Sequence, residues 1–490
     1  MKKKDDIIKG AVFLFLGKIF TFLIETLQIL LIPRILGPKN MGFYSYWLSV
    51  YFILARVLGL GGQQIIIRYV PELKVKNKLM IGSLIKKVVL VKFPVFFFII
   101  LIGSFFWRNE LSSFIIIAFA SLLFSLNLAG ESVFYSHNWM GTYALIPLVR
   151  LASRTVLVIG LFYFFYTRGI VLGIFTAPSI AFLICLFLSF RLLPRNHLPL
   201  DQPFRKHFAF GFWIYISEAL QGMIVWLITI LSKITIQDLA IVGYFGVGVQ
   251  ICFSLTLLVY FINESLLPSQ VEFHMVNDSR FKDSLKWAWK YTNLFLFPLV
   301  VGGYVLAEPF ISFFIGKDYL SGSLIIKLFF PTVIFFSWIR FHNQILFVYE
   351  RKIKIFLIQF INLCLFLGAW YYLIREKEIN LAPLSLCFGA MIAYLFALIY
   401  SHKIVKVKDY VPNLLKPLMA ATVMALGVNL FKIHSLPELI LVALGGFLLY
   451  GFSLILFKAL GKEDFKILKE FLQSVKITRY KRYFLNGKKR

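Results

Sequence analysis

Long hydrophobic runs, separated by short polar segments, make up most of this chain. An α-helix needs about 20 mainly apolar residues to cross a bilayer. The pattern predicts an all-α polytopic membrane protein with about fourteen transmembrane helices. The predicted spans are 7–32, 42–66, 86–106, 112–136, 142–166, 170–190, 209–232, 239–267, 287–310, 322–348, 353–374, 381–401, 413–431 and 437–457.

The composition agrees with lipid as the surrounding solvent. Hydrophobic residues make up 60% of the 490 positions and charged residues only 15%, whereas soluble domains are about half apolar and about 25% charged. No loop between the runs is long enough for a soluble catalytic domain, so no enzyme activity is expected. The chain has no phosphate-binding loop for ATP and no metal-ligand spacing among its histidines, so no cofactor is expected.

The basic residues of the chain indicate its orientation. The net charge is +29, but Lys and Arg lie in short loops rather than in a groove that could follow phosphates, so nucleic acid is not an expected partner. With the N-terminus inside, the inner segments hold 36 of these residues and the outer loops hold 9. This bias predicts a multi-pass protein of the cytoplasmic membrane with both termini in the cytoplasm.

Two six-helix lobes are expected from the spacing of the spans. The basic, proline-containing segment 191–207 separates them, and Gly42-Phe43-Tyr44 is echoed by Gly243-Tyr244-Phe245 one six-span unit later. Such an echo favours parallel repeats. The predicted parts are an N-terminal lobe at 1–208, a C-terminal lobe at 209–408, two additional helices at 409–460 and a basic tail at 461–490, which is either an interfacial amphipathic helix or a solvated segment.

Polar residues recur at helical spacing in four spans. Because steps of three and four share one helix face, each set forms a stripe. The stripes are Lys18, Thr21, Glu25 and Gln28; Ser45, Ser49, Arg56 and Gln63; Glu218, Gln221, Thr229 and Ser232; and Gln250, Ser254 and Glu264. They predict a central water-filled cavity between spans one, two, seven and eight. The alternative is interhelical hydrogen bonding in a dry bundle.

Ionisable residues inside spans are costly, so each is a candidate functional residue. The first half supplies four candidate anion ligands, Lys18, Arg56, Arg150 and Arg154. The candidate carboxylates for ion coupling or charge balance are Glu25, Glu218 and Glu264. Arg150 and Arg154 lie one turn apart and repel each other, so either they share an anion or nearby carboxylate or they snorkel to the interface, as Lys92 is expected to do. Arginine grips phosphate bidentately, which favours a phosphate or pyrophosphate ligand.

Several segments resemble a known family of transporters. They are Ile35-Leu36-Gly37-Pro38-Lys39-Asn40-Met41-Gly42-Phe43-Tyr44, Leu58-Gly59-Leu60-Gly61, Ile66-Ile67-Arg68-Tyr69-Val70, Val242-Gly243-Tyr244 and Phe314-Ile315-Gly316-Lys317-Asp318-Tyr319. In order and spacing they resemble the Wzx-type polysaccharide flippases of the multidrug/oligosaccharidyl-lipid/polysaccharide exporter superfamily, over about residues 7–405. Many relatives carry an Asp-Arg pair late in span seven; here that stretch is Trp226-Leu227-Ile228-Thr229-Ile230-Leu231, so any ion coupling at that Asp cannot be transferred.

The resemblance implies two six-helix lobes around a cavity and alternating access. It implies a polyprenyl-pyrophosphate-linked oligosaccharide as substrate, for O-antigen, lipopolysaccharide or other surface glycans. Membrane lipids, a coupling proton or sodium ion, and glycan-assembly proteins are the expected partners. Two alternatives stay open. One is an ion-coupled multidrug antiporter of the same superfamily, and the other is a membrane glycosyltransferase, polymerase or ligase.

Overall fold

The computed structural model describes residues 2–189, 191–192, 198–200, 203–275, 280–402, 404, 410–461 and 464, and the regular structure in them is helical. By proximity of Cα atoms the chain divides into two compact units, 1–278 with 307–405 and 279–306 with 406–490. The first unit contains α1 (Lys2–Gly59), α2 (Gly62–Lys76), α3 (Met80–Leu90), α4 (Lys92–Phe106), α5 (Leu111–Ser136), α6 (Met140–Ser189), α7 (Phe204–Ile236), α8 (Leu239–Met275), α10 (Ala307–Phe310), α11 (Ser323–Lys327), α12 (Phe330–Val348), α13 (Lys352–Arg375) and α14 (Leu384–Ser401). Short turns at Arg108–Glu110, Ile311–Ile315, Lys317–Gly322 and Ile379–Leu381 link some of these helices.

The described helices agree with a polytopic membrane protein. Ten are long and apolar enough to cross a membrane, or up to twelve if each of two bent helix pairs is one span. Two of the ten, α1 and α6, each contain one residue with non-helical backbone angles, Gly37 and Tyr166. Counting the two parts of α1 and of α6 as separate spans brings the number to the fourteen predicted from the sequence.

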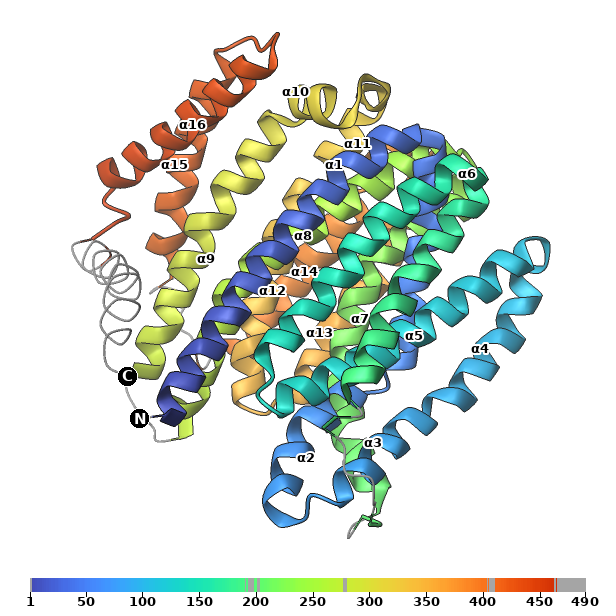
Figure 1. The fold of residues 1–490 in the computed structure, drawn as a ribbon. Coiled ribbons are helices and arrows are strands. Elements are labelled where there is room, and N and C mark those ends of the chain that lie inside the picture. Colours follow the sequence, from blue (N-terminus) through green and yellow to red (C-terminus); the bar gives the residue numbers. More distant parts are fainter. Residues whose placement is uncertain are drawn as a thin grey trace, which may run out of the picture. The chain divides into compact units, whose positions relative to one another are not determined.

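The break in α1 has a local cause. Gly37 has a φ of 70°, a value that glycine adopts without a steric penalty, and Pro38 lacks the N–H that would continue the helix. Figure 1 shows the dark blue chain rising from the N-terminus and turning back at the top of the view. The parts 17–36 and 38–59 therefore run as two consecutive spans.

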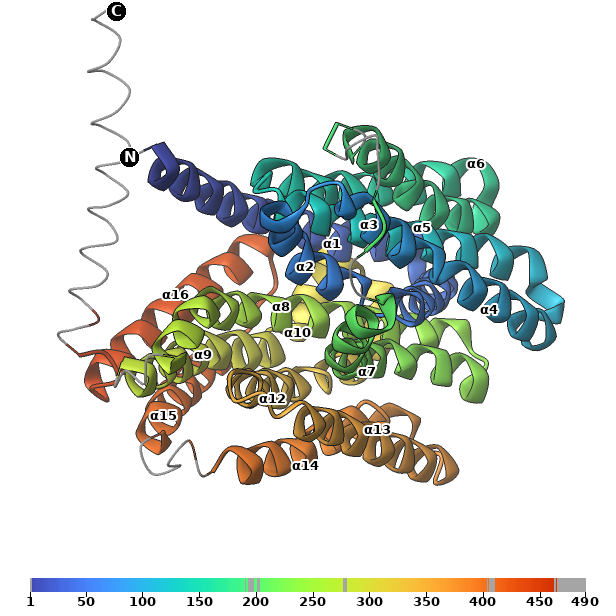
Figure 2. The ribbon, with the colours of Figure 1, turned by 90° about the horizontal axis from the view of Figure 1, so that it is seen from below.

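Within the first unit, the two halves of the sequence form two groups of helices. Figure 2 shows the first-half helices, blue to teal, on one side and α7, α8, α12, α13 and α14 on the other. The groups meet where α1 crosses α8. A Cβ atom added to Gly42 would lie 1.8 Å from the carbonyl oxygen of Leu239, and one added to Gly243 would lie 2.2 Å from that of Pro38. The two glycines of the sequence echo thus lie face to face, and small residues permit this close approach of backbones.

Alanine at Gly42 is expected to destabilise the protein by about 1–3 kcal/mol, because its methyl group would force two backbones apart. The measurement is thermal unfolding in detergent. Gly368→Ala is the matched control, since a Cβ atom there meets nothing within 4 Å and alanine favours a helix over glycine. Equal stability of the Gly42 and Gly368 variants would contradict the contact.

Lys92 binds the last carbonyl groups of α1 and does not reach the membrane interface. The prediction that its side chain snorkels is therefore wrong. Its side chain is only 2% exposed, and its Nζ donates to the carbonyl oxygens of Leu58 at 2.9 Å and Gly59 at 3.2 Å and to Ser125 Oγ at 2.6 Å. The last carbonyls of a helix have no partner within it, and a cation there also interacts favourably with the helix dipole. Lys92 therefore fixes the position where the α1 backbone breaks before α2.

The second unit contains α9 (Arg280–Val305), α15 (Val411–Asn429) and α16 (Leu436–Leu456). Tyr450 of α16 donates to the carbonyl of Leu294 in α9 at 2.7 Å, and Lys290 of α9 pairs with Asp464 at 2.6 Å. By the proximity of Cα atoms, predicted span nine, which is α9, therefore belongs to the same unit as the last two spans. The lobe boundaries at 208 and 408 stay a prediction, and the predicted tail helix lies outside the described residues except for Gly461 and Asp464.

Candidate functional site

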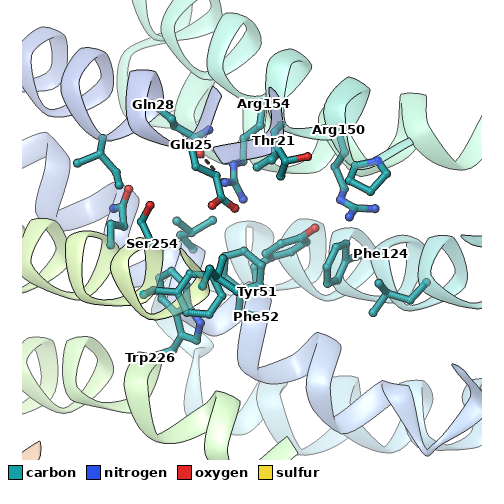
Figure 3. A pocket seen from close by; sticks show the side chains of 18 of the residues that line it. Thr21, Glu25, Gln28, Tyr51, Phe52, Phe124, Arg150, Arg154, Trp226 and Ser254 are labelled. Carbon is teal, nitrogen blue, oxygen red and sulfur yellow. Dashed lines mark hydrogen bonds between the residues drawn. The ribbon is translucent and has the colours of Figure 1, made fainter. Parts of the chain in front are cut away.

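A cavity of about 290 Å³ lies in the first unit, between helices of both sequence halves. Both parts of α1 and helices α2, α5 and α6 form one wall, and α7 and α8 form the other. Figure 3 shows the side chains that point into it. The lining residues are Thr21, Glu25, Gln28, Ile29, Leu48, Tyr51, Phe52, Arg56, Gln63, Phe124, Leu128, Pro147, Arg150, Leu151, Arg154, Trp226, Gln250, Phe253, Ser254 and Leu257.

Three of the four predicted polar stripes reach this cavity. Thr21, Glu25 and Gln28 occupy successive turns of α1, Arg56 and Gln63 come from the second span, and Gln250 and Ser254 come from α8; all of them line the cavity. The expected water-accessible cavity between these spans is therefore present. The spacing of the residues in each stripe predicted that they share one helix face. In the packed structure that face points toward the cavity.

Arg150 has a buried carboxylate partner that the sequence reasoning did not identify. Its Nη1 lies 2.5 Å from Glu131 Oε1, and the two side chains are 12% and 5% exposed. The prediction of a nearby carboxylate is thus confirmed, and Arg150 does not snorkel. Glu131 is the one acidic or basic residue in predicted span four, and the cost of an ionised group in the bilayer could have pointed to it.

Arg154 lies one turn further along α6 and is held differently. Its Nη2 donates to Gln28 Oε1 at 2.5 Å, and Gln28 Nε2 donates in turn to Thr155 Oγ1 at 3.1 Å. The guanidinium is buried and lies 5.6 Å from the Phe52 ring centroid. Its Nε has no hydrogen-bond partner within the described part of the chain. Gln28 therefore orients the guanidinium and leaves one donor unused.

The two walls of the cavity differ in charge. Glu25, Arg56, Arg150 and Arg154 all belong to the first half, and the Glu25 carboxylate is near enough to both α6 arginines to interact electrostatically. Figure 3 shows Glu25 and Arg154 pointing into the cavity together. The second-half lining is uncharged and partly aromatic, and Trp226 stacks on Phe52 with ring centroids 4.6 Å apart. The cavity can therefore hold an anion on one wall and an apolar or sugar face on the other.

The other predicted site residues lie elsewhere. Lys18 is partly buried one turn before Thr21 and does not line the cavity. Glu218 was expected to face the first-half cations, but it lines a second cavity and accepts a hydrogen bond from Gln64 at 2.9 Å. The side chain of Glu264 lies outside the described residues. Within the described ranges, no group of three His, Cys, Asp or Glu residues could hold a metal ion.

Close contacts between the two halves lie on both sides of the cavity. On one side α1 and α8 touch at Gly42 and Gly243. On the other, a Cβ atom added to Gly61 would lie 2.5 Å from the Gly211 backbone, and Tyr215 Oη donates to the carbonyl of Arg56 at 2.5 Å. Each contact joins a first-half helix to a second-half helix, so opening either side requires the two groups to separate there.

A family model described as polysaccharide biosynthesis protein matches residues 7–274, which is more than half of the chain. The chain belongs to the polysaccharide biosynthesis protein family. The matched segment contains every residue of the 290 Å³ cavity. No curated protein matches this member of the family.

Solved structures show the same fold for this member of the polysaccharide biosynthesis protein family. It is similar to the lipid II flippase MurJ in an inward closed conformation, with a TM-score of 0.70, 17% identity, and coverage of 91% of this chain and 99% of that one. It is also similar to an inward-facing MATE multidrug resistance transporter of the MOP superfamily (TM-score 0.63, 12% identity, coverage 78% and 93%). A MOP superfamily transporter from Pyrococcus furiosus, titled as having a binding pocket of reverse polarity, matches with a TM-score of 0.52, 11% identity, and coverage of 82% and 95%. The chain is thus a multi-pass membrane protein of the polysaccharide biosynthesis protein family, with the fold of these solved proteins.

Proposed function

We propose that the protein is a flippase that carries a polyprenyl-pyrophosphate-linked oligosaccharide across the cytoplasmic membrane for surface glycan synthesis, O-antigen and lipopolysaccharide included. The observation that carries this proposal is the pair of guanidinium groups on α6, at Arg150 and Arg154, that open into the cavity. Glu131 neutralises Arg150, whereas Arg154 keeps an unused Nε donor. Arginine is suited to phosphate because its planar fork donates two parallel hydrogen bonds.

The charge of the cavity supports an anionic ligand over a cationic drug. Three arginines face one cavity carboxylate, Glu25, and within the described residues the buried Glu131 pairs with one of them, Arg150. A cavity with more carboxylates than arginines would instead favour a multidrug antiporter for cations. A membrane glycosyltransferase or polymerase would need catalytic groups outside the spans, and the family and fold are those of transporters.

Energy for transport is proposed to come from the membrane potential or from an ion gradient. A pyrophosphate that moves outward carries negative charge away from the negative side, which contributes about 2.3 kcal/mol per charge per 100 mV. Glu25 is the proposed coupling group, because its protonation would remove the negative charge beside Arg150 and Arg154. Glu218 and Glu264 were candidates for the same role; Glu218 lines the second cavity and accepts a hydrogen bond from Gln64.

Alternating access is proposed to use the two contact regions between the helix groups. With both termini and the 191–207 segment in the cytoplasm, the Gly61–Gly211 contact faces inward and the Gly42–Gly243 contact faces outward. The proposed rigid parts are the lobes 1–208 and 209–408, with 409–460 as an addition. A substrate that prefers one arrangement of the lobes shifts the equilibrium toward it.

Arg56→Ala is expected to reduce flipping of the lipid-linked glycan at least tenfold at normal protein level, since a hydrogen bond to a charged group contributes about 1.5–3 kcal/mol. Arg56→Lys keeps the charge but not the fork and should retain partial activity. The assay is reconstitution in vesicles with the polyprenyl-linked glycan fraction of cells that contain the protein. Wild-type flipping by Arg56→Ala would remove Arg56 from the binding site.

A further inference from the structure

A second cavity, of about 100 Å³, lies among the second-half helices α7, α8, α12 and α13. Its polar lining residues are Ser217, Glu218, Gln221, Arg340, Asn343, Gln344 and Lys352. A cavity of this size has room for several water molecules, because one water needs about 10–15 Å³ of such volume. The function proposed above does not use it.

One buried acceptor in this cavity has no partner. Asn343 is only 6% exposed, and its Oδ1 makes no hydrogen bond within the described part of the chain. The neighbouring amide, Gln344 Nε2, is already held by the Asn263 carbonyl at 3.0 Å and by Gln270 Oε1 at 2.7 Å. A buried acceptor left without a partner costs about 1–3 kcal/mol. The Asn343 side chain is thus placed to accept a hydrogen bond from water or a ligand.

The polar and charged side chains that line the second cavity indicate which kind of ligand fits it. Glu218 disfavours a phosphate or other anion, while the side chains of Arg340 and Lys352 disfavour a metal ion. Hydroxyl, amide and charged groups together offer both donors and acceptors, which suits a ligand whose hydroxyl groups do both. The wall is firmly built, because Gln221 Nε2 donates to Tyr260 Oη at 2.9 Å and Arg340 packs 4.9 Å from the Tyr260 ring centroid. A neutral sugar ring meets these requirements.

The face of α7 connects this cavity to the first one. Glu218, Gly222 and Trp226 lie at successive turns of that face; Glu218 lines the second cavity and Trp226 the first. Between them, a Cβ atom added to Gly222 would lie 3.0 Å from Arg56 Nε, so the Arg56 guanidinium rests against the helix at this point. The rise from Gly222 to Glu218 is about 6 Å, which is comparable to the length of one sugar residue.

We infer that the second cavity is a glycan subsite that holds a neutral sugar of the lipid-linked substrate while its pyrophosphate lies at Arg56 and Arg154. The inference rests on the proposed function and adds a place for the sugar. Asn343 and Ser217 supply neutral hydrogen bonds to the sugar hydroxyls, and Glu218 accepts from one of them. Recognition of lipid and of sugar is then divided between the two cavities.

The test measures binding of two probes to the full-length protein in nanodiscs. One probe is the polyprenyl-linked glycan fraction of cells that contain the protein, and the other is bare undecaprenyl pyrophosphate. Wild type is expected to bind the glycan fraction about tenfold more tightly, since one or two hydrogen bonds of ~1 kcal/mol each separate the probes. Asn343→Ala and, separately, Ser217→Ala should reduce this preference to about twofold.

Asn362→Ala is the matched control, because Asn362 is also a fully buried amide of the second half and lines neither cavity. It should keep the full preference. The inference is overturned if wild type shows no preference, if Asn343→Ala and Ser217→Ala both keep it, or if the control loses it. Oligosaccharide released from its lipid should bind far more weakly; equal binding would assign the cavity to a free sugar instead.

Failure of the subsite and failure of the flippase proposal give different results. If only the subsite is wrong, both probes still bind and still depend on Arg154. If the flippase proposal is wrong, wild type binds neither probe.

Discussion

Arg154→Ala is expected to abolish flipping of the lipid-linked glycan and to weaken binding of undecaprenyl pyrophosphate about 10- to 150-fold. The range follows from a hydrogen bond to a charged group at about 1.5–3 kcal/mol. Among the described cavity side chains, Arg154 combines a buried guanidinium with an Nε that has no partner. Its loss removes both a positive charge and the donor that the rest of the structure leaves unused.

The conservative and control variants make this prediction specific. Arg154→Lys keeps the charge but not the planar fork held by Gln28, so intermediate affinity is expected. Arg168→Ala changes an exposed arginine on the same helix, outside the cavity, and should transport like wild type. Binding and flipping are measured with the purified protein in nanodiscs and vesicles. Normal flipping by Arg154→Ala would rule out α6 as the pyrophosphate-binding helix.

Glu131→Ala is expected to destabilise the protein by about 3 kcal/mol, because it leaves Arg150 buried without its counter-charge. Water in the adjacent cavity limits the loss, since Arg150 also lines that cavity. Glu131→Gln keeps a hydrogen-bond acceptor and should lose less. Thermal unfolding of each variant in the same detergent provides the comparison.

A double variant separates the ion pair from local packing. Glu131→Ala combined with Arg150→Leu removes both charges, so much of the lost stability should return. Arg150→Leu alone should be destabilised, because it leaves the Glu131 carboxylate buried. If the double variant is as unstable as the sum of the two single variants, the pair makes no net contribution to stability.

The two predictions also separate stability from binding. Arg154 is hydrogen-bonded to the neutral amide of Gln28, whereas Arg150 forms an ion pair with Glu131. The Arg154 variants should therefore change ligand affinity more than stability, and the Glu131 variants should do the reverse.

The sequence by itself determined the membrane-spanning helices and which polar residues share a face. Runs of apolar residues are long enough to require helices in lipid, and steps of three and four residues placed Thr21, Glu25 and Gln28 on one side of α1. The glycine echo at Gly42 and Gly243 also came from the sequence. Motifs in the sequence also pointed to a family of polysaccharide biosynthesis, and the match over residues 7–274 shows that family.

Only the tertiary structure decided how those faces meet. Helical periodicity fixes the angle between residues on one helix, but rotation against neighbouring helices depends on packing along the whole length. For that reason the sequence did not reveal the pairing of Arg150 with Glu131 on another helix, the carbonyl partners of Lys92, or the hydrogen bond from Gln64 to Glu218. Each of these contacts joins side chains or carbonyls of different helices, so it depends on how those helices are rotated and placed against each other.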